Sequence, residues 1–552
     1  MEMGRTGRTA DTVGYRLIGL ELAVGEGEEL LRERACAAAG IGPEQLRGFR
    51  ITKKSLDARR KRGGMRFQCQ VELVLSAATR TKALSRALRS GKLTLAPEPG
   101  SLIAEDGTGE GLHAVVVGSG PAGVFAALYL ALNGTRVTLL DRGARLEERG
   151  TRLVAFHRGR VPDPETNLLF GEGGAGTYSD GKLYTRVDDP LEVLLLEELV
   201  ACGAPPAILY DARAHIGTDV LHTVLPALRA RLEELGVEFR WQTRLESLDL
   251  ALGPPSVVRA VHTNQGDIPC DAVILATGHS ARDTWRALAD QGVCFEAKPF
   301  QFGVRIEHPQ ELVTRGRFGE GAEAEFLGPA SYSLVCKAGD GLPAAHSFCM
   351  CPGGKIVASV NEPERLCTNG MSNSTHSSRF ANAAVVTTFG PREFAQYADS
   401  EDDPFAGVAF QRHFEERFFE AGGSDYSAPA QTVPDFLAGR ESKGPFSTSY
   451  TFGGVPGRID TLLPDGGRDA LRRALERFER VLPGYAGPEG LLVGVESRSS
   501  GPVRMPRGRE DRRAEGFANL YPVGEGAGFA GGIMSAALDG ANSARALVLA
   551  GR

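Results

Sequence analysis

The chain has 552 residues and a formal net charge of −6, and 42% of its residues are hydrophobic and 24% charged. This length is too great for one hydrophobic core and predicts two or three domains, and the composition is that of a soluble globular protein. The negative charge argues against wholesale binding to nucleic acid, and no apolar stretch approaches the ~18 residues that a membrane-spanning helix needs.

Cysteine usage is typical of a reducing compartment. The nine cysteines are scattered, without the spacing of a disulfide framework. The sequence contains neither C-x-x-C nor a Cys/His grouping with zinc-site spacing, so we expect no metal site. With no membrane signal, these features predict a cytoplasmic protein.

Residues 1–105 are expected to form a separate α+β module. Its periodic patterns are, in order, a strand at 15–24, a helix at 28–39, strands at 49–56 and 65–75, and a helix at 79–90. This β-α-β-β-α order predicts a ferredoxin-like domain. Residues 97–111, rich in glycine, proline and acid, are the expected linker.

A basic run interrupts this module between its central strands, at residues 53–62 (K-K-S-L-D-A-R-R-K-R). Such a run can contact RNA or an acidic partner. No aromatic residue stands among its charges, and a solvated hairpin is the favoured interpretation.

A G-x-G-x-x-G motif follows a buried strand pattern at residues 114–117. Gly118 permits the tight turn, Gly120 lets backbone N–H groups approach a pyrophosphate, and Gly123 lets the next helix pack closely on the strand. That helix opens with Pro121 and Ala122, where a missing proline N–H costs nothing. A second strand pattern, 136–140, ends on Asp141, where an acid accepts hydrogen bonds from a ribose. Together these features predict a dinucleotide-binding fold.

The remaining chain carries two more glycine-rich turns. Residues 171–176 match G-x-G-x-x-G formally, but no strand pattern precedes them, so we interpret them as backbone that approaches a flat ring rather than as a second nucleotide fold. Residues 524–532 form the other turn, between a strand pattern at 519–523 and a closing helix at 533–550. The elements between these turns are expected to be a helix at 218–236, strands at 237–245, 257–263 and 272–276, an antiparallel region at 299–360, and helices at 411–421 and 469–481.

The opening motif does not distinguish NAD from FAD. The sequence shows one credible nucleotide-binding fold and two further glycine-rich turns. This combination favours a large, tightly bound FAD over a nicotinamide cofactor that dissociates. NAD(P)H stays open as a transient electron donor.

The chain resembles the uncharacterised FAD-dependent dehydrogenases of the glutathione-reductase-like flavoprotein superfamily. The stretches that carry this resemblance run from the N-terminal module to the closing helix: K-K-S-L-D-A-R at 53–59, G-S-G-P-A-G at 118–123, G-E-G-G-A-G-T-Y-S-D-G-K-L at 171–183, H-I-G-T-D at 215–219, A-T-G-H-S-A-R-D at 276–283, F-G-V-R-I-E-H-P-Q at 302–310, S-F-C-M-C-P-G-G at 347–354, T-N-G-M-S at 368–372, G-V-E-S-R-S-S-G-P-V-R at 494–504 and Y-P-V-G-E-G-A-G-F-A-G-G-I-M-S-A-A at 521–537. The resemblance implies FAD and an oxidoreductase architecture, but no substrate.

By position, the resemblance also implies which residues meet FAD. Asp141, with Arg142 beside it, would bind the adenosine ribose. The backbone near Leu245 would contact the adenine, and Thr277 and Gly278 would line the same adenosine half of the cofactor. Gly173, Gly174, Ser179, Asp180, Gly181 and Lys182 would lie along the isoalloxazine. Gly524 and Glu525 would face the pyrophosphate and ribityl part, where the wider superfamily usually carries Asp rather than Glu.

The closing helix is expected to begin at Gly531-Gly532-Ile533 beside the flavin. A helix N-terminus there stabilises negative charge, and a reduced flavin is anionic at that edge. This placement predicts a raised reduction potential.

Three residues are the candidate catalysts. Lys182 could polarise the flavin or a substrate carbonyl, or anchor a loop. Glu496 and Arg498 belong with Arg504 to a charged cluster that could bind a substrate carboxylate, although a plain salt-bridge network fits equally well. His279 follows the A-T-G turn and is expected to be structural.

Cys349 and Cys351 are the only closely spaced thiols. The helix after the glycine motif contains no cysteine, unlike that of glutathione-reductase-type enzymes. A C-x-C pair can shuttle electrons, but two buried, inert thiols are the favoured interpretation.

The expected architecture is therefore α/β: a Rossmann-like FAD-binding domain of glutathione-reductase type (112–295 and 491–552), an inserted mixed α/β substrate domain (296–490) and the N-terminal ferredoxin-like module. The expected function is hydride transfer through tightly bound FAD to or from a small organic substrate. The alternatives are an RNA-binding or RNA-modifying flavoprotein that uses the basic module, and a non-catalytic redox sensor that holds FAD. The oligomeric state is open.

Overall fold

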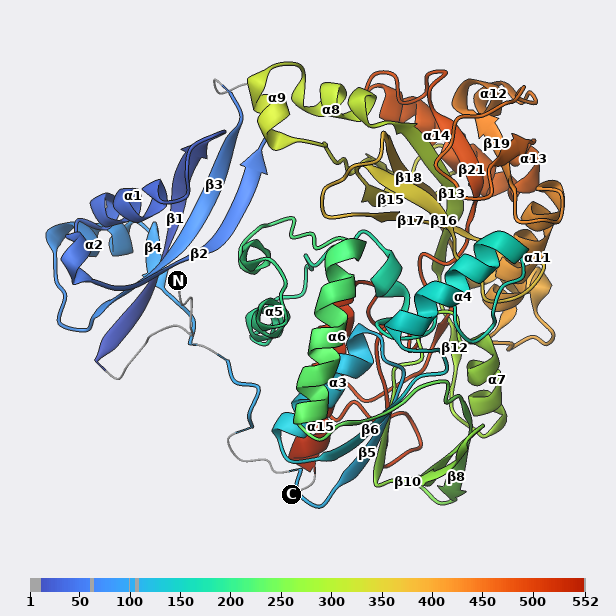
Figure 1. Ribbon diagram of the computed structural model, residues 1–552, viewed down its shortest axis with the longest axis horizontal. Coiled ribbons are helices and arrows are strands. Elements are labelled where there is room, and N and C mark those ends of the chain that lie inside the picture. Colours follow the sequence, from blue (N-terminus) through green and yellow to red (C-terminus); the bar gives the residue numbers. More distant parts are fainter. Residues whose placement is uncertain (1–10, 60–63, 99, 105–108, 551–552) are drawn as a thin grey trace. The chain divides into compact units, whose positions relative to one another are not determined.

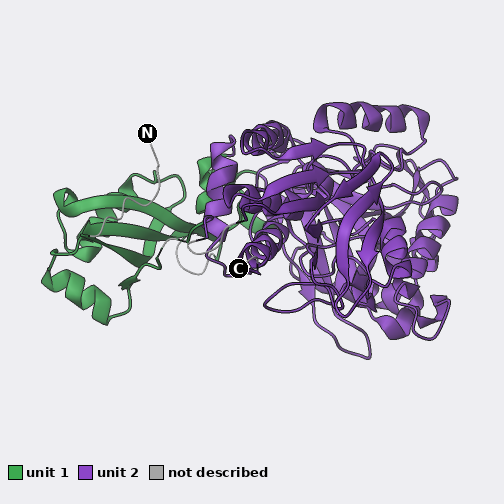
Figure 2. Cartoon of the chain, turned by 90° about the horizontal axis from the view of Figure 1, so that it is seen from below, with its two compact units in different colours: residues 1–101, 205–214, 317–328 green, residues 102–204, 215–316, 329–552 purple. Residues whose placement is uncertain are grey.

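The structure is a computed structural model that describes residues 11–59, 64–98, 100–104 and 109–550 (Figure 1). Arg60, Lys61 and Arg62 of the basic run, and part of the expected linker, lie outside these residues. The chain divides into two compact units (Figure 2). Unit 1 comprises residues 1–101, 205–214 and 317–328, and unit 2 comprises the rest.

Unit 1 is an antiparallel sheet with two helices. Its elements are β1 (Thr12–Ala23), α1 (Leu30–Ala39), β2 (Leu46–Asp57), β3 (Arg66–Ser76), α2 (Lys82–Arg89) and β4 (Leu93–Leu95). The strand order is β2-β3-β1-β4. Leu31 of α1 and Leu84 of α2 pack into one core with the alternate side chains of the strands, as the period-two pattern requires. The expected helix at 79–90 begins later, because Thr81 caps α2 by accepting a hydrogen bond from the Leu84 N–H at 3.0 Å.

Unit 1 also contains a distant segment that the sequence did not assign to it. Residues 205–214, with the short 3₁₀ helix η4 (Pro206–Leu209), pair with β2. The Lys54 N–H donates to the Tyr210 carbonyl at 2.7 Å, and the Ala212 N–H donates to the Lys54 carbonyl at 2.9 Å. Glu28 accepts hydrogen bonds from the Lys54 ammonium (2.6 Å) and the Tyr210 hydroxyl (2.9 Å). No local pattern marks such a pairing.

Unit 2 is built on a parallel five-stranded sheet of order β23-β11-β5-β6-β7. The strands are β5 (His113–Val117), β6 (Arg136–Leu140), β7 (Glu238–Arg240), β11 (Ala272–Leu275) and β23 (Leu520–Pro522). The helices of this part are α3 (Pro121–Leu132), α4 (Leu146–Gly159), α5 (Glu192–Ala201), α6 (Thr218–Glu234), α7 (Arg282–Asp290) and α15 (Ile533–Ala550). The first and last of them, α3 and α15, pack side by side.

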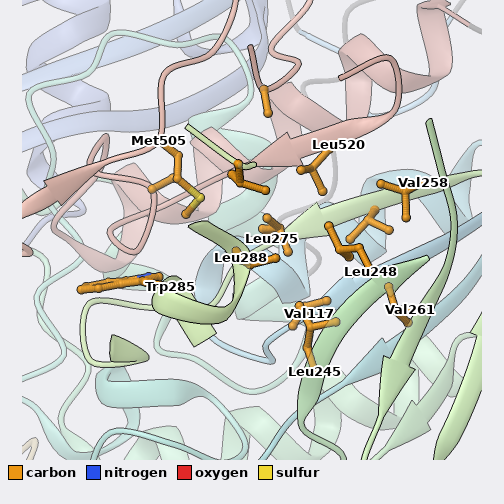
Figure 3. Packing of buried hydrophobic residues seen from close by; sticks show 14 of the residues in the cluster. Val117, Leu245, Leu248, Val258, Val261, Leu275, Trp285, Leu288, Met505 and Leu520 are labelled. Carbon is orange, nitrogen blue, oxygen red and sulfur yellow. The ribbon is translucent and has the colours of Figure 1, made fainter. Parts of the chain in front are cut away.

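A three-stranded antiparallel sheet, β10-β9-β8, is inserted in the chain between β7 and β11 of the parallel sheet. Its strands are β8 (Leu245–Ala251), β9 (Val257–Thr263) and β10 (Gly266–Pro269). A single apolar core joins the two sheets and α7 (Figure 3). In it, Leu248 and Val261 of the antiparallel sheet meet Val117 and Leu275 of the parallel sheet, with Trp285 of α7 fully buried beside them.

One expected strand, 237–245, is in fact two elements, and that prediction was wrong. The chain turns after β7, where Gln242 has a left-handed φ of +54°. The N–H of Gln242 donates to the Gly143 carbonyl (2.9 Å) and that of Thr243 to the Asp141 carbonyl (2.8 Å). These bonds end the parallel strand at the edge of β6, and β8 starts the second sheet.

The remaining part of unit 2 is organised around a seven-stranded sheet of order β14-β15-β18-β13-β21-β19-β20. Its strands are β13 (Phe300–Pro309), β14 (Val335–Cys336), β15 (Ala345–Cys351), β18 (Phe380–Phe389), β19 (Ala428–Thr432), β20 (Gly454–Pro456) and β21 (Leu491–Glu496). Two strand pairs accompany it, namely β12 (Glu296–Ala297) with β22 (Val503–Arg504), and β16 (Gly354–Ala358) with β17 (Thr368–Ser372). The helices of this part are α8 (Gln310–Phe318), whose last two residues belong to unit 1, α10 (Pro391–Phe394), α11 (Ala406–Ala421), α12 (Val433–Ala438), α13 (Ile459–Leu462) and α14 (Asp465–Glu479). The short helix α9 (Ala322–Leu327) lies in the 317–328 segment of unit 1.

The pairing in the seven-stranded sheet differs from the domain boundary expected at residue 491. Strand β21, placed by the sequence at the start of the second FAD-binding part (491–552), pairs with β13 and β19 inside this sheet. The chain returns to the parallel sheet only at β23. The cause is tertiary, because an apolar six-residue strand can join either sheet.

None of the helices in the described part of the chain is long and apolar enough to cross a membrane.

Candidate functional site

The first glycine turn has the close contacts that its motif predicts. Gly118, between β5 and α3, has a φ of +108°, and a Cβ there would lie 2.3 Å from the Ala276 carbonyl oxygen. A Cβ on Gly123 would lie 1.8 Å from the Gly118 carbonyl oxygen. Gly120 is the N-cap of α3, and it has no side chain to occupy the N–H groups of the first turn. Those N–H groups can therefore hold an anion.

Asp141 lies at the end of β6, as predicted, but its carboxylate is bound within the protein. One oxygen accepts hydrogen bonds from the Ser119 N–H (2.9 Å) and hydroxyl (2.7 Å). The other accepts from the N–H groups of Gly143 (2.8 Å) and Gly171 (2.9 Å). Since a carboxylate has about four acceptor positions, these bonds use its capacity to hold the two glycine turns together. A contact from Asp141 to a ribose stays a prediction.

Arg142, the next residue after Asp141, forms ion pairs from its guanidinium group to the carboxylates of Glu165 and Asp283, each at 2.7 Å.

The second glycine turn lies against the first. A Cβ on Gly174 would lie 3.1 Å from the Cα of Gly120. The turn continues as a short 3₁₀ helix, η3 (Gly174–Tyr178), and not as an α-helix. Arg149, fully buried, donates hydrogen bonds to the carbonyls of Asn167 (2.8 Å), Glu172 (2.6 Å) and Gly174 (2.9 Å). Burial lowers the pKa of Arg149 to about 10. This arginine sets the shape of the turn, and the sequence did not single it out.

A third part of the site is formed by Thr277-Gly278 after β11 and by Gly524-Glu525 after β23. These turns pack closely, since a Cβ on Gly526 would lie 2.6 Å from the Gly278 carbonyl oxygen. The Thr277 hydroxyl and one carboxyl oxygen of Glu525 are buried with no hydrogen-bond partner among the described residues. Burial raises the pKa of Glu525 to about 8, against the opposing effect of Lys298.

The closing helix begins where the sequence predicts. Gly531 and Gly532 precede α15, and a Cβ on Gly176 of the second glycine turn would lie 3.4 Å from a side-chain carbon of Ile533. The residues present fit a dinucleotide. The turn before α3 offers glycine backbone and helix N–H groups that no side chain caps. The turns after β11 and β23 each offer one buried oxygen without a partner among the described residues, from Thr277 and from Glu525. Leu245, expected near an adenine, is buried in the core between the two sheets.

The Ser179–Lys182 segment carries a cluster of polar side chains. Asp180 is buried and bonds to the Lys182 ammonium and to the Ser372 hydroxyl. The His215 ring lies 3.4 Å from Asp180 and stacks on the His376 ring at a centroid distance of 4.3 Å. The pKa of Asp180 is lowered overall, because the effects of Lys182 and His215 outweigh the opposing effect of burial. The carboxylate is therefore ionised.

This cluster could bring three metal ligands together, which the sequence did not predict. Asp180, His215 and His376 place ligand atoms within 4.8 Å of one another. However, Lys182 already supplies the positive charge beside Asp180. We therefore assign no metal to it.

Two more buried charges, Arg305 on β13 and Glu496 on β21, adjoin the same cluster. Their side chains form an ion pair at 3.4 Å. Arg305 donates hydrogen bonds to the side chain of Asn382 (2.9 Å) and the carbonyl of Cys349 (3.3 Å), and its Nε has no partner among the residues described. Burial raises the pKa of Glu496 to about 7, although Arg305 opposes this.

Arg498 lies elsewhere, in a buried salt-bridge network. It donates two hydrogen bonds to Glu415 on α11, at 2.9 and 2.7 Å, and another to Asn361. Arg282 donates to the same carboxylate, at 2.9 and 3.0 Å. Arg498 and Glu496 thus have different ion-pair partners, Glu415 for the first and Arg305 for the second. Burial and Arg498 lower the pKa of the neighbouring His279 to about 4, which keeps it neutral.

Comparison with known proteins adds two matches to family models. Residues 299–499 match a family described as "FAD-dependent protein, C-terminal domain-like". Residues 15–74 match a domain of unknown function. The first range contains the seven-stranded sheet together with Arg305, the two cysteines of β15 and Glu496.

A curated relative covers almost the whole chain. It is an "uncharacterized protein" from Clostridium beijerinckii, 36% identical over 550 residues, which are 97% of this chain and 99% of the relative. Among solved structures, glycine oxidase from Geobacillus kaustophilus is 11% identical, covers 80% of this chain and 94% of its own, and has a TM-score of 0.31. The protein CtdE in complex with FAD is 10% identical, with coverages of 79% and 84% and a TM-score of 0.30. TM-scores of this size do not establish a common fold.

Proposed function

We propose that the chain, which belongs to the family of its 36% identical Clostridium relative and matches an FAD-dependent family model over residues 299–499, is a flavoprotein oxidoreductase acting on a small organic substrate. The observation that carries this proposal is that the turns after β5, β11 and β23 meet at the carboxyl ends of these strands, with the second glycine turn packed against the first. Ligands of open parallel sheets bind at that edge.

The strand order supports the finer fold assignment. A parallel five-stranded sheet with a three-stranded antiparallel sheet inserted between β7 and β11 supports the expected Rossmann-like FAD-binding domain of glutathione-reductase type. In unit 1, the order β1-α1-β2-β3-α2-β4 and the sheet order β2-β3-β1-β4 support a ferredoxin-like module.

In this proposal the chain's own groups bind FAD from several sides. The N–H groups at the start of α3 hold the pyrophosphate, with Gly118, Gly120 and Gly123 allowing its approach. Thr277 and Glu525 give their free buried oxygens to the cofactor's hydroxyl groups. Gly173, Gly174 and the Ser179–Lys182 segment line the flavin ring, and the N-terminus of α15 at Gly531-Gly532 faces it. When bound, FAD supplies the capacity to accept or release a hydride.

Lys182 and Glu496 are the proposed substrate-facing residues. Glu496 has a pKa of about 7, so its carboxyl can take up or release a proton near neutral pH. Lys182 stays protonated, because Asp180 outweighs the effect of burial and raises its pKa. For Arg498 the buried bonds to Glu415 favour the structural role. NAD(P)H remains a proposed donor.

The described residues of the basic run add no support to the RNA-binding alternative. Lys54 is paired with Glu28 at 2.6 Å, and Arg59 is paired with Asp57 at 2.6 Å. Both charges are thus compensated within unit 1, and neither family match refers to nucleic acid.

The oxidoreductase proposal is tested by an anaerobic titration. The visible spectrum of the purified protein is recorded during addition of NADPH and then NADH. Bleaching of a flavin band establishes a nicotinamide-driven reductase. An unchanged band directs the search to substrate-driven oxidation or another carrier, and the absence of any flavin band after adding FAD overturns the proposal.

The proposed binding site is tested by Gly120→Ala. A Cβ at this position meets no protein atom closer than Gly174 Cα at 3.9 Å, and its φ of −70° suits any residue. We expect the cofactor-free protein to keep its unfolding midpoint, whereas FAD binding weakens by at least about tenfold, or ~1.4 kcal/mol, because the methyl group occupies the pyrophosphate approach. Equal FAD affinity in both proteins would contradict this placement.

A further inference from the structure

Cys349 and Cys351 lie at an irregular point of β15, where its pairing with β18 shifts register between Phe348 and Cys351. Cys349 is half-buried and has a left-handed φ of +44°, which is rare for a residue with a side chain. Cys351 is buried, and its thiol donates a hydrogen bond to the Cys349 carbonyl at 3.3 Å. The two thiols also form a side-chain hydrogen bond with each other, so they lie in direct contact.

Charged groups from three other parts of the chain surround this pair. The Lys182 ammonium donates to the carbonyl of Met350, the residue between the cysteines. Arg305 of β13 reaches the Cys349 carbonyl at 3.3 Å and the Cys351 sulfur at 3.8 Å. The nearby acids are Asp180, which is paired with Lys182, and Glu496, which is paired with Arg305.

These surroundings affect Cys349 differently from the other thiols. A side-chain hydrogen bond between the Cys349 and Cys351 thiols, together with Lys182 and Arg305, lowers the pKa of Cys349, although burial and Asp180 oppose this. The pKa of Cys351 is raised by the same hydrogen bond and by burial. Burial also raises the pKa of Cys36, Cys69, Cys202, Cys270, Cys294 and Cys367.

We propose that Cys349 and Cys351 are a reversible dithiol–disulfide pair, in which Cys349 is the attacking thiolate and Cys351 the resolving thiol. The reaction partner is a disulfide of the form R–S–S–R. The Cys349 thiolate attacks one of its sulfurs, which forms a mixed disulfide and releases R–S⁻. Cys351 then gives its proton to that released thiolate and attacks the Cys349 sulfur, which forms the Cys349–Cys351 bond and releases the second R–S⁻.

In this exchange the protein dithiol is oxidised by two electrons and R–S–S–R is reduced to two thiols. This inference goes beyond the proposed flavin chemistry and does not depend on it, because the exchange involves only sulfur. Its link to the proposed flavin site is Lys182, which belongs to the segment proposed to line the ring and also bonds to Met350.

The first test is a redox titration of the full-length protein in mixtures of reduced glutathione and glutathione disulfide. Free thiols are alkylated after an acid quench, and the peptide with both cysteines is examined by mass spectrometry. We expect the number of alkyl labels on this peptide to fall from two to none in one two-electron transition. In Cys351→Ser we expect a glutathionyl group to remain attached to Cys349, and in Cys349→Ser we expect no glutathionyl group on this peptide. Two labels at every ratio in the wild-type protein would overturn the proposal.

The second test is the pH dependence of alkylation by iodoacetamide, peptide by peptide, in the wild-type protein. We expect the alkylation rate at Cys349 to reach half its maximum at a clearly lower pH than the rate at Cys294, an exposed thiol with a raised pKa that serves as the control. Lys182→Met is expected to move the Cys349 midpoint upward by about one pH unit, because a neighbouring cation stabilises the thiolate. A Cys349 midpoint equal to that of Cys294 would overturn the proposal, whatever the flavin content of the sample.

Discussion

Individual carboxyl groups in this protein differ widely in acidity because their surroundings differ. Glu525 has a buried oxygen without a partner, and its pKa is raised to about 8, whereas burial of Glu415 is outweighed by two arginines, so that its pKa is lowered. The first group favours its neutral form and the second its ionised form. Both states have consequences for stability that can be measured.

Glu525→Gln is expected to change the pH dependence of stability. Between the ordinary pKa of 4.5 and the folded value of about 8, the folded protein holds a proton that the unfolded chain has released. The free energy of unfolding therefore falls as pH rises through this window, by up to about 1.4 kcal/mol per pH unit. The variant should lack this contribution, so that urea midpoints of wild type and variant converge at low pH and the variant gains relative stability towards pH 8.

Two features make this measurement decisive. Glu496, with a raised pKa of about 7, contributes a slope of the same sign in both proteins, so the difference between the two curves isolates Glu525. Both proteins are compared without cofactor. Parallel curves for wild type and variant would show that the carboxyl group is solvated in the folded state.

Glu415→Gln is expected to destabilise the protein strongly. The substitution leaves Arg282 and Arg498 buried without their common counter-charge, which typically costs ~3–5 kcal/mol. Urea unfolding measures the loss. The matched control is Glu416→Gln, the next residue, whose side chain is 54% exposed and pairs with Arg365 on the surface, and there we expect a change within about 1 kcal/mol. Equal effects at the two positions would contradict a buried network.

At the scale of elements, the site depends on close packing of the first and last helices of the dinucleotide-binding part. Gly540 of α15 lies against α3, and a Cβ there would come within 1.9 Å of the Ala122 carbonyl oxygen. Since backbone atoms cannot move aside cheaply, the two helices must separate if this glycine is replaced. The N-terminus of α3 then shifts with them.

Gly540→Ala is therefore expected to lower stability by about 1–3 kcal/mol and to weaken FAD binding. Gly150→Ala on α4 is the matched control, because a Cβ there meets no atom within 4 Å. Replacing a helical glycine in open space should stabilise the protein by up to ~1 kcal/mol. Thermal unfolding and FAD titration of both variants provide the measurements, and a neutral Gly540→Ala would refute close contact between α3 and α15.

At the scale of the whole molecule, the two units have separate cores. The core of unit 1 is formed by its own strands and helices, among them Leu31, Val71 and Leu84. The proposed FAD-binding residues all belong to unit 2. A ligand stabilises the part that binds it, so the response to FAD should differ between the units.

Hydrogen exchange with and without FAD tests this difference. We expect slower exchange with FAD in peptides that cover 113–143, 171–182 and 524–533, and unchanged exchange in β1, β2 and β3. A peptide from α14, remote in sequence from every glycine turn, is the internal control within unit 2. Protection confined to unit 1 would contradict the proposed site.

The local elements were largely predictable because their causes are local. The glycine turn at 118–123, the strand ending on Asp141 and the closing helix after Gly532 each follow from a short pattern and its turn chemistry. The split between β7 and β8 was not predictable, since hydrogen bonds to Asp141 and Gly143, distant in sequence, decide where that strand ends.

The sequence by itself therefore determined the glycine turn after β5, the strand that ends on Asp141, the closing helix and, through its resemblance to a family, FAD. Only the tertiary structure decided that Cys349 lies among Lys182, Arg305 and Cys351, and that Arg498 lies with Glu415 instead of Glu496. Hydrophobic periodicity records which face of an element is buried, but carries no information on which buried charges from distant segments meet. Those meetings set the pKa values, and so the chemistry, of this protein.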